Sequence, residues 1–111
     1  MKIQIREHDV SVTDVQRAHV ERRLAFALGR FGERIGRVTV RFLDVGHHGC
    51  KDKLCQIQVA LNARLVRIED VDADALTAFD HASARASRSV ARALERDREW
   101  DAGPFRPWTS G

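Results

Sequence analysis

The sequence predicts an α+β fold in which a four-stranded sheet carries two helices on one face, in the order β-α-β-β-β-α. One segment in which apolar and polar residues alternate precedes a helical segment, and three more follow before a second helical segment begins. With 111 residues, 43% of them hydrophobic, the chain has the size and apolar content of one ordinary globular domain.

The first strand and the first helix are predicted from local patterns. Two isoleucines within residues 3–5 alternate with polar residues, as in a strand with one buried face. Thr13 and Gln16 have the spacing of a capping box, in which two side chains satisfy backbone N–H groups reciprocally. A helix is therefore expected over residues 14–31, and Gly32 is expected to end it as a left-handed C-cap.

Three further strands are predicted in the middle of the chain. Apolar and polar residues alternate over residues 37–42 and again over 55–61, and the polar stretch 44–53 between them is expected to be a loop. A short turn at 62–63 leads to a fourth strand at 64–69. The last two strands are therefore expected to form a hairpin.

The second helix is predicted from its N-cap candidates and its apolar stripe. Asp70, Asp72 and Asp74 are residues of the type that caps helix N-termini, and their negative charge is favourable there. Apolar or small residues then recur at spacings of three and four, which places them on one helix face. They are Leu76, Phe79, Ser83, Ala86, Val90 and Leu94.

The residues after this helix are expected to form a tail. The segment 100–111 contains Gly103, Pro104 and Pro107, and proline does not continue a helix. We therefore expect one domain over residues 1–99 and a flexible or loosely docked tail over 100–111.

The composition indicates the cellular compartment of the protein but does not identify its partner. The balance of 19 Lys and Arg against 16 Asp and Glu gives a net charge of +3, which is compatible with nucleic acid without requiring it. Two cysteines are too few for a disulfide framework and indicate a reducing compartment. Residues 1–9 lack the apolar run of a signal peptide, and no stretch approaches the roughly 18 apolar residues of a membrane span. We expect a cytoplasmic protein with no membrane partner.

The second helix carries the most informative charge pattern. Four arginines are spaced by three, four and four residues, which places them along one side of the helix, away from the apolar stripe. Such a ridge fits a phosphate backbone and releases counterions on binding. It also suits a solvated helix face, and acidic residues within 95–101 dilute its end, so periodicity alone leaves both interpretations open. The four residues are Arg85, Arg88, Arg92 and Arg96.

The first helix adds a smaller basic cluster. Arg23 and Arg30 are seven residues apart and share a face, with His19 beside Arg23. Arg17 flanks the apolar stripe from the other side. Alone, the cluster also fits a solvated flank whose side-chain stems cover the core. Together with the second helix it predicts a composite basic surface.

One group of residues has the composition of a metal site. Four potential zinc ligands occur close together in the sequence. Strand alternation, however, places Cys55 on the core face, where a free cysteine behaves as a small hydrophobic residue. We favour this second interpretation and expect no metal and no cofactor. The four residues are His47, His48, Cys50 and Cys55.

Motifs of catalysis are absent from the sequence. It contains no phosphate-binding glycine-rich loop, no G-x-S-x-G elbow and no H-E-x-x-H. We therefore expect a protein that is not an enzyme and has no small-molecule substrate. The strands also lack an exposed aromatic pair of the kind that stacks RNA bases, so an RNA partner would be recognised by shape and phosphates.

Four features of the chain occur together in a known order. The opening strand runs through Val12-Thr13 into a helix that ends in Arg30-Phe31-Gly32, and Ile35-Gly-Arg-Val38-Thr-Val40 begins the next strand. The segment Asp74-Ala-Leu-Thr-Ala-Phe79-Asp80 opens the second helix, and the basic spacing follows it. In these features, over about residues 2–98, the chain resembles the bacterial ribosome hibernation-promoting factor and ribosome-associated inhibitor family, in which Asp-x-x-x-Ala-[Ile/Phe]-Asp opens the second helix.

The resemblance implies the β-α-β-β-β-α fold, related in outline to the double-stranded-RNA-binding domain, and the small ribosomal subunit as partner. Family members bind it in stationary phase or stress, with their basic helices in the decoding region used by tRNA and mRNA. A monomer that inhibits translation sterically is therefore expected. Because the chain stops at Gly111, it resembles the short members, which lack a C-terminal dimerisation domain. The basic positions carried over as RNA-binding are Arg17, Arg23, Arg85, Arg88, Arg92 and Arg96.

Two other classes of function remain open from the sequence. One is a metal- or thiol-dependent regulatory module that uses His47, His48, Cys50 and Cys55. The other is a protein-interaction domain of the same fold that binds, for example, an acidic regulator.

Overall fold

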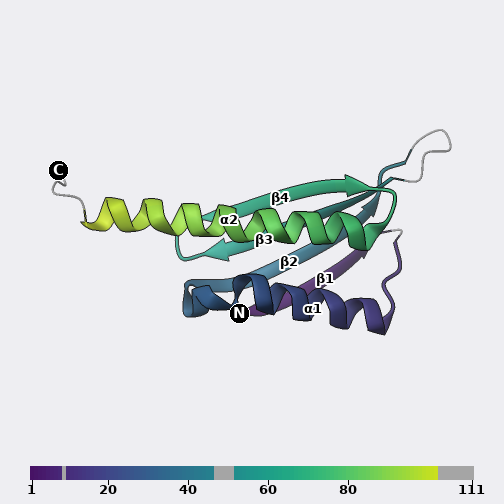
Figure 1. The fold of residues 1–111 in the computed structure, drawn as a ribbon, viewed down its shortest axis with the longest axis horizontal. Helices are drawn as coiled ribbons and strands as arrows, with labels where there is room; N and C mark the ends of the chain where they lie inside the picture. Colours follow the sequence, from purple (N-terminus) through teal and green to yellow (C-terminus); the bar gives the residue numbers. More distant parts are fainter. Residues whose placement is uncertain (9, 47–51, 103–111) are drawn as a thin grey trace.

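The computed structural model describes residues 1–8, 10–46 and 52–102, and their side chains as far as residue 96. Within these residues the elements follow the predicted order, with one short 3-10 helix, η1, after the first helix (Figure 1). Their bounds are β1 Lys2–His8, α1 Asp14–Leu28, η1 Gly29–Arg34, β2 Ile35–Asp44, β3 Lys53–Leu61, β4 Leu65–Asp72 and α2 Ala75–Ala102.

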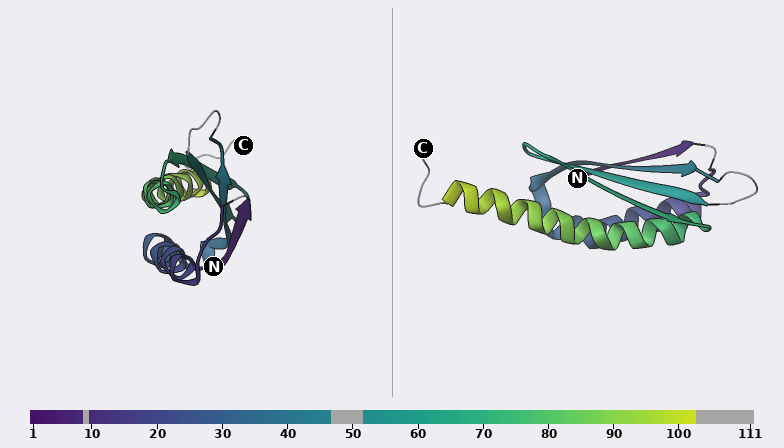
Figure 2. Two further views of the ribbon diagram at one scale, coloured as in Figure 1. Left: turned by 90° about the vertical axis from the view of Figure 1, so that its right-hand side faces the viewer. Right: turned by 90° about the horizontal axis from the view of Figure 1, so that it is seen from above.

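The strands form one sheet in the order β1-β2-β3-β4. β1 and β2 are parallel, as expected for two strands joined through a helix, whereas β2, β3 and β4 are antiparallel neighbours joined by shorter connections. α2 lies over β3 and β4 with α1 beside it, and both helices cover the same face of the sheet (Figure 2). The predicted α+β class and two-layer architecture are confirmed, and no helix of the described residues covers the opposite face of the sheet.

Alternate strand residues point toward the helices and form the core. Every second residue of β2 and β3 is buried over most of their length, as the sequence alternation predicts. Phe79 of α2 is fully buried, and its ring centroid lies 6.4 Å from that of Phe42 in β2, so this aromatic pair joins helix and sheet. Other large side chains that are fully buried include Val20, Leu24, Leu28, Ile35, Val38, Ile57 and Val90.

The start of α1 is predicted correctly, and its end is not. Thr13 and Gln16 form the capping box, with both reciprocal hydrogen bonds present. The helix ends at Leu28 rather than at residue 31, because Gly29 has low helix propensity and the chain continues as η1. Gly32 does adopt a positive φ of 58°, which glycine tolerates, but it turns the chain within η1 and does not cap α1.

The limits of β4 and α2 also differ from the prediction. β4 is displaced and longer than residues 64–69, because its ladder with β3 continues to the pair of Lys53 and Asp72. α2 continues through residues 100–102, so the expectation that the helix stops before residue 100 is wrong. The first proline in the sequence after α2 is Pro104, and proline is common one or two residues beyond the end of a helix. No helix in the described part of the chain is long and apolar enough to cross a membrane.

Candidate nucleic-acid interface

α2 presents three exposed arginines that lie on successive turns. Arg88, Arg92 and Arg96 are spaced by four residues, so their backbones rise about 6 Å from one to the next along the helix. All three side chains are exposed, and none forms a hydrogen bond or ion pair with another described residue. Their guanidinium groups are therefore free to bind an external anion.

The fourth arginine of the predicted ridge has a different environment. Arg85 Nη1 donates to the backbone oxygen of Glu69 at 2.8 Å and to Asp70 Oδ2 at 3.1 Å. Both acceptors belong to β4, which α2 covers. Arg85 therefore ties α2 to the sheet and has part of its charge balanced within the domain, although its side chain remains half-exposed.

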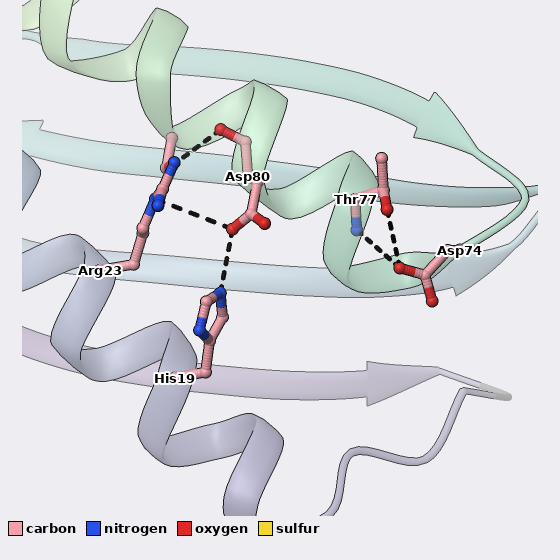
Figure 3. Close-up of polar contacts among 6 residues, drawn as sticks. His19, Arg23, Asp74, Thr77 and Asp80 are labelled. Carbon is pink, nitrogen blue, oxygen red and sulfur yellow. Dashed lines mark hydrogen bonds and ion pairs between the residues drawn. The ribbon is translucent and has the colours of Figure 1, made fainter.

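The two helices are joined by a polar clasp formed by His19, Arg23 and Asp80. Asp80 Oδ1 lies 3.0 Å from His19 Nε2 and 3.8 Å from Arg23 Nε, so one carboxylate of α2 holds two side chains of α1 (Figure 3). The His19 ring also meets Phe79 edge-on, with centroids 6.3 Å apart. The Asp80 clasp therefore fixes α1 beside α2 at the point where their basic surfaces meet.

Arg17 of α1 and Arg30 of η1 differ in the same way. Arg17 Nη2 donates to Glu7 Oε1 at 3.1 Å, and the other oxygen of this carboxylate accepts from the backbone N–H of Val12. Arg30 Nη2 donates to Ser87 Oγ on α2 at 3.3 Å, and its guanidinium carbon lies 4.6 Å from the centre of the Phe31 ring. Arg17 is thus paired with a carboxylate, whereas Arg30 keeps its full charge because its contacts are neutral.

Asp74, Phe79 and Asp80 of the segment 74–80 each have a structural role. Asp74 Oδ2 accepts hydrogen bonds from Thr77 N at 3.0 Å and Thr77 Oγ1 at 2.8 Å, so Asp74 is the N-cap of α2 (Figure 3). Phe79 fills the core, and Asp80 forms the clasp to α1. The segment therefore sets the start and the orientation of α2 and thereby the direction of its arginines.

The six arginines predicted to bind RNA separate into two groups. Three are paired with carboxylates of the domain, and three are unpaired among the described residues. Only the unpaired group lies in one continuous row, on α2. The paired residues are Arg17, Arg23 and Arg85, and the unpaired residues are Arg88, Arg92 and Arg96.

Sequence reasoning missed two exposed features. One is Phe26 of α1, a large apolar side chain that is 88% exposed. The open face of the sheet also carries basic side chains at the outward positions of its strands. The alternation itself contains this second signal, because the polar residues of the predicted strands include several arginines.

Of the four residues proposed for a metal- or thiol-dependent module, the structure describes Cys55 alone. Cys55 is a free cysteine in the core, and burial, aided by the negative charges of Asp70 and Asp80, raises the pKa of its thiol to about 12. A buried neutral thiol is a poor metal ligand and a poor nucleophile. His47, His48 and Cys50 lie outside the described residues, and the described residues contain no cluster of metal-ligating side chains.

Comparisons with known proteins relate the chain to ribosomal factors. Residues 3–98 match the family model described as Sigma 54 modulation protein / S30EA ribosomal protein. The chain is similar to the crystal structure of the Protein Y N-terminal domain from Thermus thermophilus, with 32% sequence identity and a TM-score of 0.69, over 83% of this chain and 98% of that one. A ribosomal subunit interface protein from Coxiella burnetii shares the fold at 15% identity and a TM-score of 0.74, over 86% and 99%. No curated protein sequence matches significantly.

Proposed function

This chain belongs to the sigma 54 modulation protein / S30EA ribosomal protein family, and on that premise we propose that it binds the small ribosomal subunit near the decoding region and inhibits translation sterically. The family comprises ribosome-binding factors without catalytic activity, so the chain is a ribosome-associated regulator of translation and not an enzyme. In the proposal it acts as a monomer in the cytoplasm, in stationary phase or under stress.

The row of unpaired arginines on α2 is the observation that carries the proposal. Arg88, Arg92 and Arg96 are exposed on a helix about 42 Å long, so a phosphate backbone can approach them without displacing any of the described side chains. Arginine binds phosphate oxygens with two parallel hydrogen bonds, which fixes orientation as well as charge. None of these three groups forms an ion pair with a carboxylate of the described residues.

The paired arginines have a second role in the proposal. Arg23 and Arg85 keep half of their side-chain surface exposed while carboxylates hold them, so they contact RNA from fixed positions. Arg17 lies on the other flank of α1, beside β1, and adds a further cation there. Holding these groups before binding lowers the loss of side-chain entropy on association.

The inhibition needs no chemical step. A domain seated in the decoding region excludes tRNA and mRNA by volume, and its affinity comes chiefly from the release of counterions around rRNA phosphates. Binding is therefore expected to weaken steeply as the salt concentration rises, while inhibition of translation follows occupancy.

Sedimentation of the protein with ribosomes through a sucrose gradient at low salt tests the proposal. Wild-type protein is expected to move with the small subunit and to inhibit translation in a cell-free system. The double variant Arg88→Glu/Arg92→Glu is expected to stay at the top of the gradient and to leave translation active. If this variant sediments like the wild type, the α2 row is not the contact surface.

A matched control separates the surface from the total charge. Arg34 is the last residue of η1 and Arg64 lies in the β3–β4 turn, and both are exposed. The variant Arg34→Glu/Arg64→Glu changes the net charge by the same amount, and it is expected to sediment nearly as the wild type does. Binding that resists nuclease treatment and needs no ribosome would instead favour a protein-interaction domain.

A further inference from the structure

The face of the sheet that the helices leave open is strongly basic. The outward positions of the four strands carry five cationic side chains but a single carboxylate, that of Glu69. Glu69 Oε2 already accepts a hydrogen bond from Gln56 Nε2 at 2.6 Å. The cations are Lys2, Arg6, Arg37, Arg41 and Arg67.

Four of these cations form a basic quartet in which like charges are neighbours. In the parallel ladder of β1 and β2, Lys2 pairs with Arg37 and Arg6 pairs with Arg41. Neighbouring strands lie only about 4.8 Å apart, and like charges at directly opposed positions destabilise a sheet. None of the four side chains forms a hydrogen bond or ion pair with another described residue. The domain itself therefore leaves this charge unbalanced.

Protection of the sheet edge explains only half of the quartet. Charged side chains on an edge strand oppose pairing with another chain, and β1 is an edge strand, which accounts for Lys2 and Arg6. β2 lies inside the sheet, paired on both sides, so Arg37 and Arg41 protect no edge. Their presence opposite two other cations needs a different reason.

The surroundings of the quartet suit a phosphate backbone. Gln4, Thr39 and Gln58 lie side by side at the neighbouring register position and supply neutral hydrogen-bonding groups. Gln58, with its amide oxygen turned toward Arg67, accepts from Nε and Nη2 of that guanidinium at 3.3 and 3.1 Å, so Arg67 is positioned without loss of charge. No aromatic side chain of the described strands points outward here, which favours contacts to phosphate and sugar over base stacking.

We infer that the open sheet face is a second RNA-binding surface, centred on the basic quartet, and that the domain is held between two RNA segments. The inference rests on the proposed function, because it takes the ribosome as the source of both segments. The helices and the open sheet face lie on opposite sides of a two-layer domain, so one RNA segment cannot cover both (Figure 2). An RNA backbone on the sheet supplies the counter-charge that the quartet lacks.

Charge reversal on β2 tests this surface. The variant Arg37→Glu/Arg41→Glu is expected to bind small ribosomal subunits at least roughly tenfold more weakly than the wild type at low salt, because two phosphate contacts become repulsive. It is also expected to keep or raise the thermal midpoint, since each new carboxylate lies opposite Lys2 or Arg6. A loss of binding without a loss of stability separates an RNA contact from a structural role.

The controls make each result decisive. If Arg37→Glu/Arg41→Glu binds like the wild type, or if Arg34→Glu/Arg64→Glu loses as much affinity, the sheet surface is refuted. Should the glutamate variant fail to fold, Arg37→Gln/Arg41→Gln removes the charge without reversing it, and unchanged binding of that variant refutes the surface equally. If the α2 double variant binds normally while the β2 variant does not, the helical site fails and the sheet surface stands.

A photo-crosslinking side chain at Thr39 identifies what covers the face. Thr39 lies at the centre of the register, between Gln4 and Gln58, so the probe sits among the basic residues without replacing one. In the complex with small ribosomal subunits, crosslinks to rRNA are expected. Crosslinks to a ribosomal protein alone, or none above those of the unbound protein, would overturn the inference.

Discussion

The helical face and the open sheet face are both basic, but they hold their cations differently. On the helices, Asp80 balances Arg23, and Asp70 balances Arg85. On the sheet, Arg37 and Arg41 of β2 face other cations, and the described residues supply them with no carboxylate. Ion pairs therefore hold Arg23 and Arg85 of the helical face, whereas the register of β1 against β2 places Arg37 and Arg41 beside other cations.

The difference separates charges that are balanced within the fold from charges that remain available to a partner. An arginine paired with a carboxylate contributes to positioning and gives up part of its attraction for an external anion. An unpaired arginine on a rigid element contributes little to stability and keeps its charge available. By this criterion Arg88, Arg92 and Arg96 on α2, and Arg37 and Arg41 on β2, are the groups most available to RNA.

Combining variants of the two faces is expected to give the largest effect. The logarithm of the binding constant falls linearly with the logarithm of salt concentration, with a slope that loses about 1 for each phosphate contact removed. Arg88→Glu/Arg92→Glu and Arg37→Glu/Arg41→Glu should each lower the slope by about 2, and their combination by about 4. Titration of small subunits at several salt concentrations measures the slopes. If the combined variant is no weaker than either parent, the faces do not bind independently.

Removing a buried and an exposed phenylalanine ring from the helices is expected to change stability by different amounts. Phe79→Ala is expected to lower the free energy of unfolding by about 3–5 kcal/mol, because its ring is fully buried against Phe42. Phe26→Ala removes a ring that is 88% exposed and should change stability by less than about 0.5 kcal/mol. Urea unfolding of the two variants measures both values. Equal losses would contradict the assignment of the core to one face of each helix.

Because the thiol of Cys55 is buried between the helices and the sheet, we expect the folded protein to lose stability at high pH. Burial raises the pKa of Cys55 to about 12 from an ordinary value of 9.0, so the unfolded chain ionises first as the pH rises. The contribution of the neutral thiol is complete below pH 9 and is lost between pH 9 and 12. By pH 10 the wild type should lose about 1.4 kcal/mol relative to Cys55→Ala.

Denaturant unfolding at pH 8 and pH 10 measures that difference. Subtracting the Cys55→Ala values removes the contributions of lysines and other groups that titrate in the same range. A constant difference between wild type and variant at the two pH values would show that the thiol is accessible to water, which would reopen its use as a ligand.

Breaking the clasp between the helices is expected to have the smallest effect. Asp80→Asn keeps the shape of the side chain but removes the charge that holds His19 and Arg23. Because all three side chains are partly exposed, the expected loss is about 0.5–1 kcal/mol, seen as a lower midpoint in thermal or urea unfolding. Glu95→Gln, at an exposed position of α2, is the control and should leave the midpoint unchanged. A loss as large as that of Phe79→Ala would mean that Asp80 does more than join two surfaces.

Local patterns in the sequence predict the elements and most of the core. The capping box of Thr13 and Gln16 and the N-cap of Asp74 involve residues within one helical turn, so sequence spacing is sufficient to find them. The alternation in β2 and β3 likewise predicts their buried face. The end of α1 was missed because the change to η1 at Gly29 depends on how the chain must enter β2.

The division of the arginines could not be predicted from the same patterns. The partner of Arg23 is 57 positions away in the chain, at Asp80, and that of Arg85 is 15 away, at Asp70. The basic quartet likewise requires the register of β1 against β2, which no local spacing defines. Periodicity shows which residues share a face, whereas charge balance on that face depends on which elements become neighbours.

Chemical footprinting of rRNA in small ribosomal subunits tests the central claim most directly. Bound wild-type protein is expected to protect nucleotides of the decoding region, and Arg88→Glu/Arg92→Glu is expected to lose that protection while Arg34→Glu/Arg64→Glu retains it. Protection confined to a site outside the decoding region, or protection that the α2 variant preserves in full, would contradict the proposed mode of binding.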